Sequence, residues 1–135
     1  MMLMMFLALQ TSTANSFSNV PESVMKTFKV MFPNAESISW EDNEEMFTAY
    51  FLEGEIEREA LFDSEGKWLE TSTVIEEESI PEKITAYVDS KYEVDSYESI
   101  IKVESPDKIL YFLIFETEDD SYEIVVDENG KPVKE

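Results

Sequence analysis

Apolar residues recur at every fourth position in two segments of the chain. They are Val20, Val24, Phe28 and Phe32 in the first segment, and Ile80, Ile84, Val88 and Tyr92 in the second. Residues four apart lie on one side of a helix, so each segment predicts an amphipathic helix with one buried stripe. We expect Pro33 to end the first helix and the second to end near Tyr92.

Each predicted helix follows the same short pattern. Asn19-Val20-Pro21-Glu22 and Ser79-Ile80-Pro81-Glu82 both place a polar residue three positions before a glutamate. In a capping box of this kind, the glutamate returns a hydrogen bond to the capping residue. The pattern predicts that Asn19 and Ser79 cap the two helices.

Short alternating segments, rich in aromatic residues, follow each helix. They cover residues 36–41, 46–53, 55–62 and 67–71 after the first helix, and 99–104, 109–117, 122–126 and 132–134 after the second. Short strands joined by tight turns pair antiparallel. The predicted fold class is α+β, with two tandem helix-plus-four-stranded antiparallel meander units forming one layered helix-on-sheet domain.

A turn motif also recurs. Phe62-Asp63-Ser64-Glu65-Gly66-Lys67 matches Val126-Asp127-Glu128-Asn129-Gly130-Lys131 at an offset of 64 residues, and the helices match at an offset of 60. An Asp-x-x-Gly-Lys sequence between apolar runs predicts a hairpin in which glycine takes a positive φ. We interpret the chain as a tandem duplication, with repeat 1 at 19–72, an acidic linker at 73–78 and repeat 2 at 79–135.

Residues 1–14 differ in composition from the rest. The apolar run 2–9 precedes the small residues Ser12 and Ala14, which suit the positions that a signal peptidase reads, although no basic residue precedes the run. The run is far shorter than the ~20 residues of a membrane-spanning helix. We predict a signal peptide at 1–14 and a periplasmic or secreted mature protein. The alternative is an apolar strand or helix packed on the domain.

The charge of the chain and the residue types that it lacks exclude several classes of function. The 135 residues include 10 Lys+Arg, 31 Asp+Glu and no His or Cys, which gives a net charge of −21. Without these side chains there is no thiolate nucleophile, no Ser-His-Asp triad and no zinc site with nitrogen or sulfur ligands. The acidic excess disfavours nucleic acid and anionic membranes. We expect a non-enzymatic protein with no cofactor and no membrane insertion after signal cleavage.

Strand alternation assigns side chains to two faces of the predicted sheet. A two-residue turn at Glu53-Gly54 places Leu52 opposite Glu55 and Phe51 opposite Ile56. The face beneath the helices then holds Phe47, Ala49, Phe51, Ile56, Ala60 and Phe62 in the first repeat, and Leu113, Phe115, Tyr122, Ile124 and Val126 in the second.

The opposite face carries apolar residues among glutamates: Tyr50, Leu61, Phe112, Ile114 and Val125. An apolar patch rimmed by acids is typical of a protein-binding sheet. We predict that these five residues bind a protein partner. The alternative is that the N-terminal segment, the linker or a second copy of the chain covers them, the last case giving a homodimer through the sheet face.

The remaining candidates have more ordinary interpretations. Trp40 and Trp68 are expected to be core anchors, and Arg58 to reach an acidic partner or the sheet edge. Glu116, Glu118, Asp119 and Asp120 surround a predicted hairpin tip but lack the order of an EF-hand loop. We expect a solvated turn there. The alternative function is a periplasmic acidic protein that binds Ca²⁺ or a small ligand through carboxylate clusters.

Four segments carry a further pattern: Val20-Pro21, Phe32-Pro33-Asn34-Ala35, Trp40 and Phe62-Asp63-Ser64-Glu65-Gly66-Lys67-Trp68. In this order they resemble the beta-lactamase-inhibitor-like, PepSY-like family over about residues 19–135. The resemblance implies an exported protein of the Bacteroidetes type with tandem helix-plus-antiparallel-sheet units. The second repeat departs from the pattern at Tyr92-Glu93 and at Pro132. Inhibition of a beta-lactamase is not implied, because function does not follow from fold.

Overall fold

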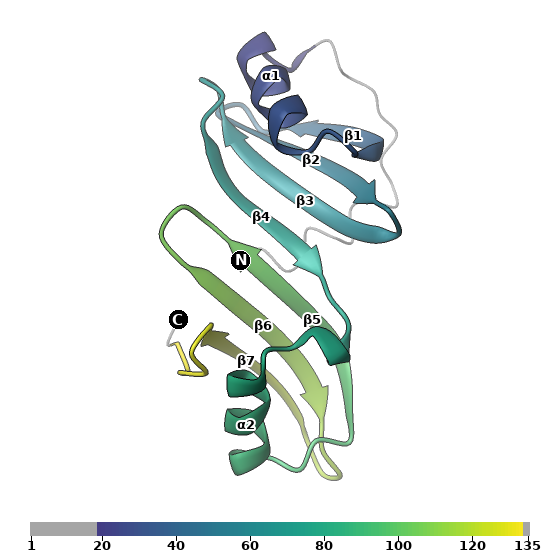
Figure 1. Cartoon of the computed structure of the whole chain (residues 1–135), viewed down its shortest axis with the longest axis vertical. Coiled ribbons are helices and arrows are strands. Elements are labelled where there is room, and N and C mark those ends of the chain that lie inside the picture. The colour runs from purple at the N-terminus through teal and green to yellow at the C-terminus, as the bar shows by residue number, and fades with distance from the viewer. Residues whose placement is uncertain (1–18, 134–135) are drawn as a thin grey trace. The chain divides into compact units, whose positions relative to one another are not determined.

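The computed structural model describes residues 19–133, which fall into two compact units. Unit 1 ends at Thr73 and unit 2 begins at Val74. The predicted signal peptide at 1–14 lies outside the described residues. Figure 1 shows one helix and a set of antiparallel strands in each unit, so the α+β class is confirmed.

Unit 1 contains α1 (Glu22–Met31), β1 (Glu36–Asp42), β2 (Met46–Glu53), β3 (Ile56–Asp63) and β4 (Trp68–Val74), all but the last residue of β4 lying before the boundary. Each strand pairs antiparallel with the next along the chain, which makes a simple meander. All four strands were predicted, with boundaries that differ by up to three residues.

Unit 2 contains α2 (Glu82–Lys91), β5 (Ser96–Glu104), β6 (Ile109–Glu116) and β7 (Ser121–Asp127), preceded by a 3₁₀ turn at Glu77–Ser79. The predicted strand at 132–134 is wrong as far as the structure describes it, because Pro132 forms only an isolated bridge with Val126. Proline has no backbone N–H with which to extend a ladder. The described part of unit 2 therefore has three strands.

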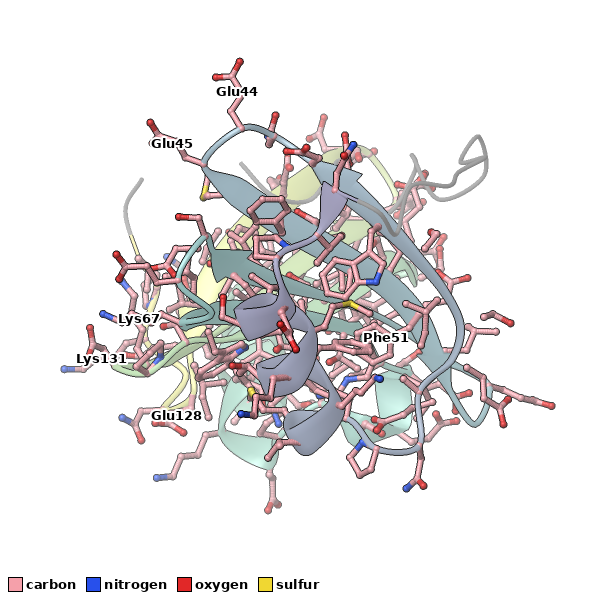
Figure 2. All side chains as sticks on the ribbon, turned by 90° about the horizontal axis from the view of Figure 1, so that it is seen from above. Glu44, Glu45, Phe51, Lys67, Glu128 and Lys131 are labelled. Carbon is pink, nitrogen blue, oxygen red and sulfur yellow. The ribbon has the colours of Figure 1, made fainter. Side chains whose placement is uncertain are left out.

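Both predicted helix stripes are confirmed. Val24, Phe28 and Phe32 are buried on the strands of unit 1, and Ile80, Ile84 and Val88 on those of unit 2. Phe28 meets Trp40 and Phe51 edge to face, with ring centroids 5.2 and 5.1 Å apart. Figure 2 shows Phe51 beside α1, while Glu44 and Glu45 point outward from the β1–β2 hairpin. Aromatic packing of this kind adds to the free energy gained by burying area.

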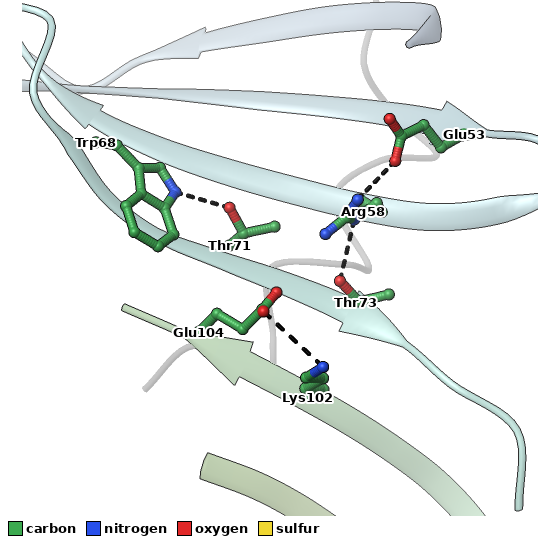
Figure 3. A network of polar contacts seen from close by, with 7 residues as sticks. All are labelled: Glu53, Arg58, Trp68, Thr71, Thr73, Lys102 and Glu104. Carbon is green, nitrogen blue, oxygen red and sulfur yellow. Dashed lines mark hydrogen bonds and ion pairs between the residues drawn. The ribbon is translucent and has the colours of Figure 1, made fainter. Parts of the chain in front are cut away.

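The tryptophans contact this core, as expected. Trp40 belongs to the buried cluster of unit 1, and the partly buried Trp68 packs against it. The indole N–H of Trp68 donates to Thr71 Oγ1 at 2.7 Å (Figure 3). The Trp40 Nε1 is buried and has no hydrogen-bond partner.

The predicted capping boxes are wrong. The helices begin at Glu22 and Glu82, with Pro21 and Pro81 at the N-cap positions and no side-chain cap. Both prolines have extended backbone, and the Pro21 carbonyl accepts the N–H groups of Val24 and Met25 at 3.1 Å. Because proline itself occupies the N-cap, Asn19 and Ser79 lie two residues too early to cap.

The β2–β3 register differs from the predicted one by two residues. Glu53 pairs with Ile56 and Leu52 with Glu57, so the turn residues are Gly54 and Glu55. An even shift keeps every side chain on its face, and the predicted faces of β2 therefore hold. Ile56 is the exception, because at the end of the hairpin it is 50% exposed rather than part of the core.

The corrected register explains the environment of Arg58, which lies opposite Phe51 on the helix side. Its guanidinium forms an ion pair with Glu53 and donates from Nε to Thr73 Oγ1 at 3.1 Å (Figure 3). It also lies 5.3 Å from the ring centroid of Phe32. The expectation of an acidic partner is confirmed. The partly exposed site avoids the cost of an isolated buried charge.

Candidate functional site: the sheet faces opposite the helices

The candidate site is the strand surface opposite the helix, which we call the outer face of each unit. In unit 1, cross-strand pairing aligns Tyr50 with Glu59 and Ser72, and Thr48 with Leu61 and Glu70. In unit 2, Ile101 lies opposite Phe112, which lies opposite Val125. Because cross-strand partners share a face, these rows define the two outer faces.

The five predicted binding residues all lie on these outer faces, but they differ in exposure. Tyr50 is 3% exposed and Val125 is 9% exposed, whereas Leu61, Phe112 and Ile114 are partly exposed. Tyr50 and Val125 are therefore largely inaccessible to a partner in this structure. Leu61, Phe112 and Ile114 are the predicted residues that remain accessible to a partner.

Sequence reasoning missed two buried apolar residues of the outer face in unit 2. Ile101 and Val103 are buried but do not belong to the cluster beneath α2, which contains Ile100. The adjacent pair Ile100-Ile101 was the available signal, since neighbouring residues of a strand point to opposite faces. Two consecutive isoleucines therefore require apolar surroundings on both sides of β5.

The outer face of unit 1 contains buried acids. Glu59 is only 4% exposed, and its Oε1 has no hydrogen-bond partner. Glu70, on the neighbouring strand, is partly buried and has an unpartnered Oε2. Nearby, the Tyr50 hydroxyl donates to Glu41 Oε1 at 2.5 Å. A buried carboxyl oxygen without a partner is costly when the group is charged.

These surroundings change the ionisation of Glu59, Glu70 and Tyr50. Burial, with smaller contributions from Glu70 and Glu41, raises the pKa of Glu59 to about 8. Burial also raises the pKa of Glu70. The pKa of Tyr50 is raised by burial first and then by its hydrogen bond to Glu41. Glu59 is therefore mainly a neutral acid at pH 7, which lowers the cost of its burial.

The importance of Glu59 was not visible in the sequence. It belongs to the alternating series Glu55, Glu57 and Glu59, which is typical of a solvated strand face. Glu57 follows that expectation and is exposed, whereas Glu59 lies opposite Tyr50 in the middle of the sheet. Distance from the hairpin end distinguishes the two glutamates.

Glu59→Gln is expected to alter how stability depends on pH. A carboxyl group with a folded pKa of about 8 and an ordinary value of 4.5 loses its stabilising contribution as pH rises through that interval. Glutamine has no such dependence. Since one pKa unit corresponds to about 1.4 kcal/mol, the interval from 4.5 to about 8 predicts that the variant gains on the order of 4 kcal/mol over the parent between pH 5 and pH 9.

Urea unfolding at both pH values measures this difference, and the exposed Glu57→Gln on the same strand is the matched control. Stability curves that run parallel for the parent and Glu59→Gln would show that the carboxyl group titrates normally.

The structure does not favour the calcium alternative. Within residues 19–133, no three acidic side chains are grouped so as to hold a metal ion. Glu118, Asp119 and Asp120 are exposed on the turn between β6 and β7.

Neither described helix has the length and apolar character needed to cross a membrane.

Comparison with known proteins places the chain in a family. A family model described as "Putative beta-lactamase-inhibitor-like, PepSY-like" matches residues 45–134, more than half of the chain. The chain therefore belongs to this PepSY-like family, and the resemblance noted in the sequence is confirmed. No curated protein matches it.

Solved structures share the fold. A BLIP-like protein from Bacteroides fragilis has a TM-score of 0.73 at 21% identity, covering 93% of this chain and 88% of that one. A DUF2874 family protein from Bacteroides uniformis has a TM-score of 0.75 at 18% identity, covering 84% and 86%. A protein from Bacteroides eggerthii described as "putative periplasmic" has a TM-score of 0.75 at 17% identity, covering 85% and 86%.

Proposed function

We propose that this chain is an exported, non-enzymatic binding module that recognises a protein partner through its outer faces. The observation that carries the proposal is the position of Leu61, Phe112 and Ile114, which are partly exposed apolar side chains opposite the helices. Family membership supports it, as does the BLIP-like description of the Bacteroides fragilis structure. Exposed apolar side chains on a sheet are suitable anchors for a partner.

The test is capture of a partner with the immobilised chain, followed by affinity measurement on variants. Leu61→Ala and Phe112→Ala are each expected to weaken binding by about 30-fold, which corresponds to ~2 kcal/mol for an anchoring residue. Val30→Ala is the control, because Val30 is 76% exposed on α1, on the opposite side of unit 1. Equal affinities for the parent and both outer-face variants would show that the partner binds elsewhere.

Export is a separate part of the proposal. It is supported by the composition of residues 1–14 and by the periplasmic description of the Bacteroides eggerthii relative. We expect protein isolated from its host to begin near Asn15, as determined by N-terminal mass spectrometry. Intact Met1 on protein from the cytoplasmic fraction would contradict export.

A further inference from the structure

The outer face of unit 1 holds two acids that are close in register and form no ion pair with any Lys or Arg in residues 19–133. Glu59 on β3 pairs with Ser72, and Leu61 pairs with Glu70 on β4, so the two glutamates are diagonal neighbours on one face. Side chains in this relation lie within reach of one another across a sheet. The influence of Glu70 on the pKa of Glu59 agrees with this proximity.

No ion pair seen in residues 19–133 involves either acid, and burial holds Glu59 mainly in its neutral form at pH 7. Arg58 pairs with Glu53 and Lys102 pairs with Glu104, and Arg58 lies on the helix side of the sheet. The Tyr50 hydroxyl is already donated to Glu41. Glu59 Oε1 and Glu70 Oε2 thus remain as two buried carboxyl oxygens with no hydrogen-bond partner. Buried acceptors of this kind are uncommon in folded proteins.

We propose that Glu59 and Glu70 together receive one basic side chain of the protein partner. This inference rests on the proposed function and names the chemistry of that partner. A guanidinium group suits the pair best, since its several N–H donors can reach two separate carboxyl oxygens. Binding supplies the donors that the two oxygens lack and a positive charge between two acids.

Access and long-range charge favour the same occupant. Glu70 and its cross-strand neighbour Leu61 are partly exposed, so an incoming side chain meets Glu70 first and reaches the buried Glu59 past it. The apolar side chain of Leu61 can pack against the aliphatic part of an incoming arginine or lysine. With a net charge of −21, the chain also attracts basic partners and accelerates their association.

The two acids link binding to pH. A cation stabilises the ionised form of Glu59, so binding lowers its pKa from about 8 and releases a proton near neutral pH. Glu70 on β4, with Glu41 on β1 and Tyr50 on β2, are the titratable groups that act on Glu59 across the face. Affinity for the cation is therefore expected to rise with pH up to the pKa of Glu59.

The experiment is a titration of the full chain followed through the side-chain carboxyl ¹³C resonances. The probe is N-acetyl-arginine amide, and its neutral isostere N-acetyl-citrulline amide is the ligand control. Saturable shifts of Glu59 and Glu70 are expected with the arginine compound only, and the pKa of Glu59 should fall by roughly one unit at saturation. Equal shifts with both compounds, or no saturable shift up to about 100 mM arginine compound, would overturn the proposal.

Variants test whether Glu59 and Glu70 together cause the shifts seen with the arginine compound. Glu59→Gln should abolish the shift at Glu70, and Glu70→Gln the shift at Glu59, while the exposed Glu57→Gln should leave both unchanged. Melting curves verify that each variant is folded. If Leu61→Ala weakens partner binding but the arginine compound does not bind, the cation site is wrong and the binding module stands. If the arginine compound binds but Leu61→Ala and Phe112→Ala leave partner affinity unchanged, the proposed function fails instead.

Discussion

Val24→Asp and Ile84→Asp are each expected to unfold the unit that contains the substituted helix. Both side chains are fully buried at the centre of their helix stripes. A carboxylate placed there without a partner costs several kcal/mol, which is comparable to the 5–15 kcal/mol that stabilises a whole domain. Circular dichroism melting is the measurement, and loss of the native transition is the expected result.

Val30→Asp is the matched control, because it introduces the same charge at an exposed position of α1. It should melt within about 0.5 kcal/mol of the parent. Parent-like melting of either buried variant would contradict the assignment of the helix faces.

Gly66→Ala and Gly130→Ala are expected to destabilise the protein by about 2–4 kcal/mol each. The two glycines have φ values of +89° and +84°, and an added Cβ would lie 2.7 Å from the Ser23 carbonyl oxygen or 2.6 Å from that of Lys83. The obstacle is helix backbone, which cannot move aside as a flexible side chain can. Denaturant unfolding measures the loss.

Gly54→Ala separates backbone conformation from the clash. Gly54 also has a positive φ, +67°, but an added Cβ would meet nothing within 4 Å. Its substitution should cost only the ~1 kcal/mol of the left-handed conformation. If all three alanine variants lose the same stability, the close contact with the helices contributes nothing.

The spacing of apolar residues predicted the helices and strands well, because an element that buries one face needs apolar residues at that spacing. The stripes through Val24 and Ile84 follow from spacing alone, and the faces of β2 and β6 follow from alternation. Even the incorrect β2–β3 register kept Tyr50 and Leu61 on the predicted face, since the error was two residues. The sequence did not show whether the two-residue turn is Glu53-Gly54 or Gly54-Glu55.

Properties that depend on packing were not predictable in this way. Asn19 is a residue type that commonly caps helices, but the N-cap position is two residues later and is occupied by Pro21. The burial of Tyr50 and Glu59 depends on what surrounds the sheet. The alternation of side chains assigns each residue to a face but does not show whether that face is covered. The unpartnered carboxyl oxygens are likewise a property of the three-dimensional arrangement.

The contact between each helix and the final turn of its unit has a consequence for the order of folding. Ser23 Oγ and Thr27 Oγ1 donate to the carbonyl oxygens of Ser64 and Gly66, 41 and 39 residues further along the chain. Such distant partners cannot meet until nearly the whole unit has been synthesised, and non-local contacts of this kind slow folding. As the chain emerges, the apolar stripe of α1 is made first and covered last. A nascent chain of this protein therefore carries an unburied helix that a chaperone can recognise until β1, β2, β3 and the turn after β3 have been synthesised.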